Sequence, residues 1–380
     1  MLPSRPEIPD TIELRRRLHR VPELGFLEFE TSQVLKKHMA QLGAIRPIGE
    51  TGFFIDLGPD DAARTILLRA DMDGLPVTEE TGLSHASIFP GFMHACGHDG
   101  HMAALVSAAF RLSGKLPPNL RVRVFFQPAE EGRGGARFSI EQGVLEGVDA
   151  AFGLHLWNEL PLGSVAISDG GIMASVAEFE VCFRGVGGHG ALPQRANNPI
   201  LAASSLVTAL ESYSGELGSR GVLSVGSFKA GEAFNVIPET ARVTGTARAF
   251  DTLTQSENEE TLRRLSRSIA DLKGIQTEFI WKAHHPVTHN SPVFAKHARD
   301  AANRVPGVSR VLKDYRTMAG EDFGEILAEV GGAYALLGSG KEDGTSAPHH
   351  SPYFDIDERS LELAVTLHCE VVGQYAADGA

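Results

Sequence analysis

The chain of 380 residues has few cysteines, fewer basic than acidic residues and no long apolar segment. Its three cysteines, Cys96, Cys182 and Cys369, are too few and too scattered for a disulfide framework. Basic residues number 35 against 48 acidic ones, so the sequence lacks the cationic surface that nucleic-acid phosphates require. No apolar run approaches the ~20 residues that span a bilayer, and the amino terminus has no apolar stretch typical of a signal peptide. We therefore expect a cytoplasmic protein that binds neither nucleic acid nor membranes.

The length of the chain indicates two domains, because 380 residues exceed the usual size of a single hydrophobic core. In the first part of the chain, apolar strands alternate with amphipathic helices, which is typical of an α/β sandwich. The strands expected there are residues 53–57, 65–69, 122–126 and 150–156. The helices expected there are residues 12–18, 31–42 (capped by Thr31 or Ser32), 100–112 and 135–142.

The pattern changes near residue 177. From there to residue 281 the predicted order is strand, helix, strand, strand, helix, strand, which is the order of a ferredoxin-like βαββαβ unit. A helical segment and an apolar strand after residue 287 resume the α/β pattern. We therefore predict a discontinuous catalytic α/β domain, residues 1–176 and 288–380, with an inserted ferredoxin-like domain, residues 177–287.

Cys96 and His98 stand two residues apart, directly before an Ala-rich predicted helix. A thiolate and a neutral imidazole are good ligands for zinc and other borderline divalent ions. On its own, such a pair is more often a small buried side chain beside a histidine at a helix start. Further candidate ligands are Glu131, His155 and His350, and their presence favours a metal site over that simpler explanation.

Two adjacent carboxylates, Glu130 and Glu131, follow the apolar strand of residues 122–126. Like charges side by side are costly unless a cation or a proton separates their roles. One division gives Glu131 to a metal and makes Glu130 the general base for a water molecule. The alternative is a solvated acidic pair in a loop, against which the buried strand before the pair and Gly132 after it both argue.

Four other residues are more ambiguous. Asp71 could orient a ligand histidine from behind, or simply end its strand in a turn. His189, in a glycine-rich segment of the inserted domain, could donate to a developing oxyanion, although a flexible hairpin tip is the more common explanation. Asn235 and Arg248 lie in the same domain, and an arginine suits the capture of a substrate carboxylate as well as the solvation of a strand.

Taken together, these segments resemble the dinuclear-metal aminoacylase/carboxypeptidase family. They look closest to its branch of N-acyl-amino-acid amidohydrolases, hippurate hydrolases and plant auxin-conjugate hydrolases. The matching segments cover essentially the whole chain and are residues 18–26, 69–76, 94–101, 127–132, 153–157, 187–191, 235–239, 320–323 and 350–357. Relatives typically carry alanine at the position of Gly74. His349 adds a second imidazole beside His350, although His350, directly before Ser351 and Pro352, fits the pattern better.

The resemblance implies two divalent metal ions, which could be zinc, manganese, cobalt or nickel. The ligands that it implies are Cys96, His98, Glu131, His155 and His350. In this arrangement Cys96 bridges the two ions, His98 and His155 hold one ion, and Glu131 and His350 hold the other. Glu130 is then the general base and acid. The inserted domain is implied to be a lid through which the protein forms a homodimer or a higher homo-oligomer. Within it, His189, Asn235 and Arg248 are implied to contact the substrate or its oxyanion.

We therefore predict a metal-dependent amidohydrolase that cleaves N-acyl amino acids, with acetyl, benzoyl or similar acyl groups, to a carboxylate and a free amino acid. One alternative is a dipeptidase or carboxypeptidase of the same family. Another is a non-catalytic metal- or ligand-binding member, which would not need Glu130. A structural zinc site predicts a closed shell of four ligands, and ligands spread from Cys96 to His350 fit an open catalytic site better.

Overall fold

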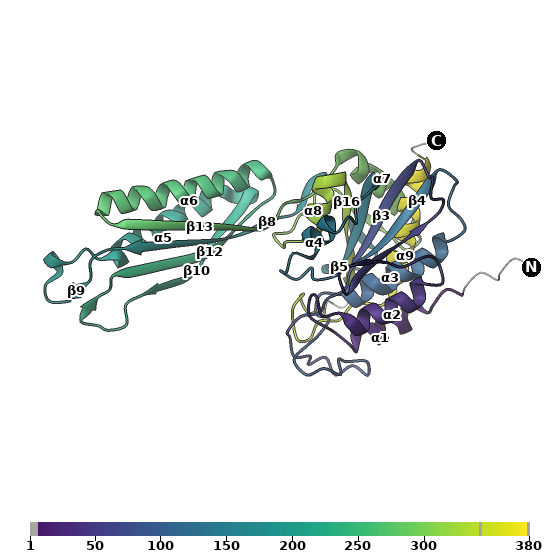
Figure 1. Cartoon of the computed structure of the whole chain (residues 1–380), viewed down its shortest axis with the longest axis horizontal. Coiled ribbons are helices and arrows are strands. Elements are labelled where there is room, and N and C mark those ends of the chain that lie inside the picture. Colours follow the sequence, from purple (N-terminus) through teal and green to yellow (C-terminus); the bar gives the residue numbers. More distant parts are fainter. Residues whose placement is uncertain (1–6, 342–343, 378–380) are drawn as a thin grey trace, which may run out of the picture. The chain divides into compact units, whose positions relative to one another are not determined.

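The computed structural model describes residues 7–341 and 344–377. The chain divides into two compact units (Figure 1). The first unit combines the chain up to Ile172 with His289–Tyr315 and the chain from Asp322 onward. The second unit combines Met173–Thr288 with Arg316–Glu321. The chain thus leaves the first unit, forms most of the second, and returns.

The first unit is built on an eight-stranded sheet with the order β1-β2-β4-β3-β5-β16-β6-β15. Its strands are β1 (Arg46–Ile48), β2 (Gly52–Leu57), β3 (Arg64–Asp71), β4 (Leu120–Gln127), β5 (Ala150–Pro161), β6 (Ser164–Ala166), β15 (Arg310–Leu312) and β16 (Gly332–Gly340). The central strands β4, β3, β5 and β16 run parallel to one another. Parallel strands covered on both faces need side chains that are apolar on both faces, and β3 and β16 are buried along nearly their whole length.

Helices cover both faces of this sheet. They are α1 (Thr11–His19), α2 (Phe29–Met39), α3 (His98–Leu112), α4 (Gly135–Glu141), α7 (Pro292–Ala302), α8 (Phe323–Val330) and α9 (Arg359–Ala377). Helix α3 packs against α1, α2 and α9, and α7 packs against α9, whereas α4 packs against α8. The two groups of helices lie on opposite faces of the sheet. Successive residues of β5 show this, because Phe152 contacts His368 of α9, whereas Gly153 lies against Phe323 of α8. The main core lies between the sheet and the α3–α9 layer.

The second unit is a four-stranded antiparallel sheet with the order β10-β12-β8-β13. Its elements are β8 (Ser175–Arg184), α5 (Pro199–Leu217), β10 (Gly221–Ala230), β12 (Thr240–Ala249), α6 (Thr252–Lys273) and β13 (Gln276–His285). Both helices pack on the sheet and share its apolar core. Short strands β9 (Gly188–His189) and β11 (Val236–Ile237) pair outside it, and short helices cover Pro193–Arg195 and Gly218–Arg220. The remaining strands, β7 (Gly170–Met173) and β14 (Thr288–Asn290), pair with each other.

The predicted fold class is confirmed: a mixed α/β sheet unit carries an inserted βαββαβ unit. One local prediction is wrong. Helix α2 begins at Phe29, so Thr31 and Ser32 lie inside it and Glu28 occupies the N-cap position. The side chain of Glu28 does not cap the helix, because both of its oxygens bind elsewhere.

Within the described part of the chain, no helix combines the length and the apolar character needed to cross a membrane.

Candidate metal centre

Cys96 and His98 lie at the start of α3, where the chain turns sharply. Gly97 occupies the N-cap position with φ +90°, a conformation that favours glycine, so the helix can begin at His98, only two residues after Cys96. The Cys96 Sγ atom lies 3.4 Å from Nε2 of His155, which comes from the middle of β5. All three side chains are buried. Cys96 and His155, which are 59 positions apart in the chain, are therefore close enough to bind the same metal ion.

His98 presents a nitrogen that has no hydrogen-bond partner in the described structure. Its Nδ1 donates to the backbone carbonyl of Asp73 at 2.9 Å, which leaves Nε2 as the lone-pair nitrogen. Burial alone would lower the pKa of His98, but the carboxylates of Asp71 and Asp73 and the more distant Glu131 raise it to about 10. A position at which carboxylates attract a proton so strongly attracts a divalent cation for the same electrostatic reason.

His155 is oriented in the same way. Its Nδ1 donates to the carbonyl of Leu156 at 2.8 Å, so that Nε2 faces Cys96. Burial, followed by the neighbouring His101 and His349, holds the pKa of His155 well below its usual value. The imidazole is therefore neutral at physiological pH, which is the form that binds a metal.

The loop after β4 carries Glu130 and Glu131 and is held by another carboxylate. Asp73 accepts the backbone N–H of Glu130 at 3.1 Å and that of Glu131 at 2.9 Å. The residue before them, Ala129, has φ +58° and is fully buried. Glu130 is buried and Glu131 half-buried. The backbone of both glutamates is thus held in a fixed position, as a metal ligand and a general base would require.

The adjacent histidines His349 and His350 have different surroundings. The Nε2 atom of His350 lies 3.3 Å from Oε1 of Glu131, and its backbone N–H donates to Ala95 beside Cys96 at 2.8 Å. His350 also has φ +66°, a strained conformation for a residue other than glycine. His349 instead stacks on Trp157 and donates from Nε2 to the carbonyl of Leu156. Burial lowers the pKa of His349 to about 4, so it stays neutral.

Cys96 belongs to two sets of three possible metal donors. Cys96, His98 and His155 form one set, and Cys96, Glu131 and His350 form the other; within each set the ligand atoms lie within 4.8 Å of one another. A third set joins His98 with Glu130 and Glu131. Thiolate, imidazole and carboxylate donors suit zinc and related divalent ions. The unpartnered Nε2 of His98 adds to this fit, so the residues present suit a pair of neighbouring metal ions.

Next to these donors, Asp71 belongs to a buried network, and with His98 and His101 it forms a further set of possible ligands. Its Oδ1 accepts from Nδ1 of His101 at 2.7 Å, and its Oδ2 accepts from Arg69 at 2.6 Å. His101 in turn accepts the backbone N–H of Leu156, the neighbour of His155. Burial opposes ionisation, but His98 and Arg69 hold the pKa of Asp71 well below its usual range. Asp71 thus orients His101, while the orientation of His98 comes from the Asp73 carbonyl.

Asp322 extends this network in an unexpected direction. It occupies the N-cap position of α8 but makes no side-chain cap there. Its carboxylate instead accepts from Arg69 at 3.0 Å, from Gln127 at 2.8 Å, and from the backbone N–H of Ala136 in the first turn of α4. The carboxylate therefore joins β3, β4 and α4 instead of capping its own helix.

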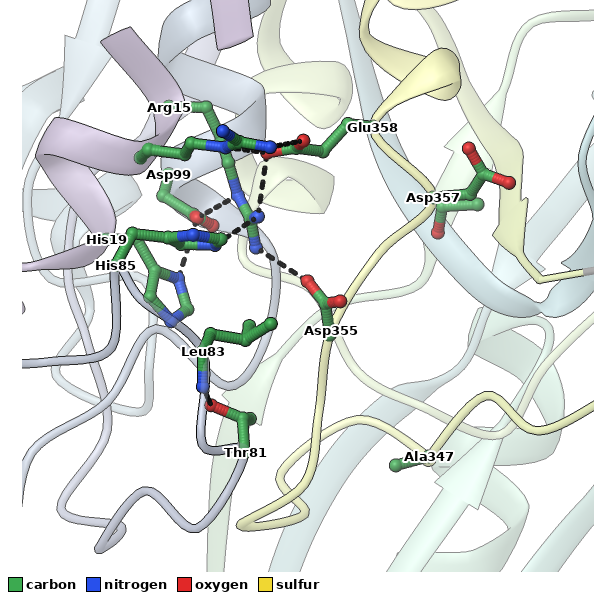
Figure 2. Close-up of polar contacts among 12 residues, drawn as sticks. Arg15, His19, Thr81, Leu83, His85, Asp99, Ala347, Asp355, Asp357 and Glu358 are labelled. Atoms are coloured by element: carbon green, nitrogen blue, oxygen red, sulfur yellow. Dashed lines mark hydrogen bonds and ion pairs between the residues drawn. The ribbon is translucent and has the colours of Figure 1, made fainter. Parts of the chain in front are cut away.

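A second buried network lies behind the start of α3 (Figure 2). Arg15 of α1 is fully buried and donates to Asp99 at 2.7 Å, and it reaches Asp355 and Glu358 at 3.2 Å each. His19 donates to the same Asp99 oxygen at 2.8 Å. Because Asp99 directly follows His98, this network connects α1 to the helix turn that presents a candidate ligand.

The three candidates of the inserted domain all belong to the second unit. His189 and Asn235 are exposed neighbours: His189 pairs with Val236 in the β9–β11 ladder, and Gly190 donates to the Asn235 carbonyl. His189 Nδ1 accepts the N–H of Ala191 at 3.0 Å. Arg248 lies apart from them in β12, half-buried, and donates to the carbonyl of Met318 at 2.6 Å.

Sequence reasoning missed Asp73, Glu28 and the Arg15 network. Asp73 lies two residues after Asp71 in the same motif. In an extended segment this spacing places both side chains on the same side, which is the signal in the sequence that points to Asp73. Glu28 and Arg15 carry no local signal, since their partners Ala129 and Asp99 are 101 and 84 residues away in the chain.

Comparisons with known proteins agree with this geometry. The chain matches the model of Peptidase family M20/M25/M40 over residues 67–374. It is 38% identical over 360 residues to N-acetyl-L-cysteine deacetylase of Bacillus subtilis, with 92% of this chain and 84% of that protein covered. It is 35% identical to IAA-amino acid hydrolase ILR1-like 4 of Arabidopsis thaliana, with 96% and 85% covered. A Bacillus subtilis structure described as a dinuclear metal binding peptidase from the M20 family gives a TM-score of 0.84 at 33% identity, with 95% and 96% covered.

Proposed function

This chain belongs to peptidase family M20/M25/M40, and we propose that it is an amidohydrolase that releases free amino acids from N-acyl amino acids. Its reaction class is metal-dependent hydrolysis of amides. The names of the two relatives describe a deacetylase of N-acetyl-L-cysteine and a hydrolase of IAA-amino acids, and both fit an acylated amino acid as substrate. The observation that carries the proposal is the pair of donor sets that share Cys96 beside Glu130.

We assign the metal ligands from these sets. His98 and His155 would hold one ion, Glu131 and His350 would hold the other, and Cys96, which belongs to both donor sets, would be a ligand shared by the two. The metals that we propose are zinc, manganese, cobalt or nickel. Ions bound there would act as Lewis acids toward the amide carbonyl and would acidify a water molecule.

In this proposal Glu130 moves the protons. Its backbone is fixed by Asp73, and its carboxylate lies in one donor set with the His98 imidazole and the Glu131 carboxylate. A carboxylate at this place can accept a proton from the attacking water and return it to the amine that leaves. His189 would stabilise the oxyanion and Arg248 or Asn235 would bind the substrate carboxylate. We further propose that the second unit acts as the lid and the dimer contact, which its exposed Phe234 supports, and that the protein is cytoplasmic.

The substrate class is tested by measuring amino-acid release from N-acetyl, N-benzoyl and longer N-acyl amino acids and from dipeptides. The enzyme is loaded separately with zinc, manganese, cobalt or nickel, with a chelated control. Metal-dependent release from the N-acyl compounds supports the proposal, whereas cleavage of dipeptides alone makes this protein a peptidase. No release from any compound by protein that has bound metal would favour a binding protein.

The role of Glu130 is tested by Glu130→Gln, with Glu141→Gln at the exposed end of α4 as a matched control. General-base catalysis contributes about 10²- to 10⁴-fold, so kcat should fall by that factor while both metal equivalents stay bound, as measured by elemental analysis. Loss of metal together with kcat would contradict the division of labour between Glu130 and Glu131.

A further inference from the structure

We propose that Glu28 is a positioning residue for the hydrolysis: its buried carboxylate holds the backbone of Ala129 and thereby fixes Glu130. This inference rests on the proposed role of Glu130 as general base. It assigns to the loop between α1 and α2 a part in the chemistry, although that loop supplies no candidate ligand.

Both oxygens of Glu28 are used in holding other segments. Its side chain is fully buried. Oε1 accepts the backbone N–H of Ala129 at 2.8 Å, and Oε2 accepts the hydroxyl of Thr51 at 2.7 Å. Glu28 stands at the N-cap position of α2, where a short polar side chain would ordinarily bind the first backbone N–H groups, yet it makes no such bond. The carboxylate therefore accepts a hydrogen bond from Ala129 instead of capping its own helix.

The backbone that Glu28 holds has an unfavourable conformation at Ala129. Ala129 has φ +58°, a left-handed conformation in which its Cβ crowds the backbone. A Cβ added to Gly25 would lie 2.8 Å from Cα and Cβ of Ala129, so the α1–α2 loop closes over this residue without a gap. The next two backbone N–H groups, of Glu130 and Glu131, bind Asp73. Three successive amides are thus captured by two carboxylates from distant segments.

Holding an ionised carboxylate here is unfavourable for folding, which indicates that it serves a purpose. Burial raises the pKa of Glu28 to about 6, and the nearby charge of Asp73 adds to that rise, although the bonds from Thr51 and Ala129 oppose it. A neutral side chain of similar size would fill the same space without this cost. The carboxylate is the better acceptor for the strained amide of Ala129, because hydrogen bonds to ionised acceptors are the stronger ones.

The test compares Glu28→Leu, which removes the acceptor, with Glu28→Gln, whose Oε1 can still accept from Ala129. Glu30→Gln makes the same chemical change as the second variant two residues away, on an exposed side chain of α2. The readouts are kcat and KM on the best N-acyl substrate, the metal content, and hydrogen exchange in peptides that cover Ala129–Glu131. Misplacing a catalytic group by about 1 Å can lower a rate by about 10²-fold.

We expect Glu28→Leu to lower kcat about 10- to 100-fold with KM and metal content retained, and to speed exchange at residues 129–131. Glu28→Gln, whose neutral amide oxygen still accepts from Ala129 but more weakly, should lower kcat by no more than about threefold, and Glu30→Gln should keep the kcat of the wild type. If Glu28→Leu does not fold, Thr51→Val removes one partner of Glu28 and should speed exchange at the same amides while lowering kcat about threefold or more. A merely structural role would lower activity only in proportion to the folded fraction.

Two results would overturn the proposal: wild-type kcat in folded Glu28→Leu or Thr51→Val protein, or unchanged exchange at residues 129–131. Failure of the proposed function has a different signature. Wild-type protein would then cleave none of the substrates, while the exchange measurement, which needs no substrate, would still decide whether Glu28 fixes the loop.

Discussion

The ion pairs that enclose His19 should make the stability of the first unit depend on pH. His19 is fully buried, with Nδ1 2.8 Å from Asp99 and Nε2 3.3 Å from Glu79. Burial alone would lower the pKa of His19, but Asp99 and Glu79 raise it to about 9. The folded protein therefore binds this proton more tightly than the unfolded chain, in which the pKa is near 6.5. The resulting stabilisation is fully present below pH 6.5 and is lost as the pH rises through about 9.

The magnitude follows from the two pKa values. A tenfold change in proton affinity corresponds to about 1.4 kcal/mol, so a rise from 6.5 to about 9 corresponds to about 3 kcal/mol of unfolding free energy. In His19→Gln the amide can still donate to Asp99 but carries no titrating proton. The difference in unfolding free energy between wild type and variant should therefore shrink by about 3 kcal/mol between pH 6.5 and 9.5.

The measurement is urea unfolding of chelator-treated protein at pH 6.5, 7.5, 8.5 and 9.5. Trp157 belongs to the first unit and Trp281 to the second, so a Trp281→Phe background makes the fluorescence report on the first unit alone. His289→Gln, on an exposed histidine, is the control and should follow the parental curve at every pH. A wild-type advantage over His19→Gln that stays constant from pH 6.5 to 9.5 would refute the reasoning, because other titrating groups are common to both proteins.

Two further predictions concern the shared candidate ligand Cys96 and the buried cation Arg69. Cys96→Ala removes the donor that both sets share, so elemental analysis should find less than one metal equivalent per chain, where loss of a ligand to one ion would leave about one. Arg69→Met leaves Asp71 and Asp322 buried without their cation and should lower the unfolding free energy by about 3–5 kcal/mol in urea denaturation; a change below about 1 kcal/mol would show that the carboxylates find other partners.

Much of the fold could be predicted because an element that buries one face repeats its apolar residues with the spacing of a helix or a strand. The prediction placed strands β3, β4 and β5 and the six βαββαβ elements of the second unit near their observed positions, but it did not include the short strands β9 and β11. Helix α9 escaped prediction because it is buried on several sides, so its apolar residues show no single face. Three-residue strands such as β6 and β15 exist only through their pairing partners, which sequence alone does not reveal.

The sequence predicts the possible metal ligands of the candidate site but not the residues that hold those ligands in position. Cys96, His98 and Glu131 carry a recognisable chemistry in short motifs, and the structure brings them together with His155 and His350. A supporting residue has no such signature. Its role is set by whichever backbone amide or charge lies opposite it after folding, and the partners of Glu28 and Arg15 are far away in the chain.

The supporting residues also strengthen the argument for metal ions. Asp71, Asp73, Glu28 and Glu130 are all buried, and Asp73 contributes to the raised pKa of Glu28. Buried carboxylates gathered around one small volume repel one another, and such an arrangement is favourable only when cations share the space. Arg69 faces Asp71 and Asp322 and lies behind the donors, so its charge is already committed there. Divalent ions between Cys96, His98, Glu131, His155 and His350 would supply the missing positive charge at the place where the negative charge is concentrated.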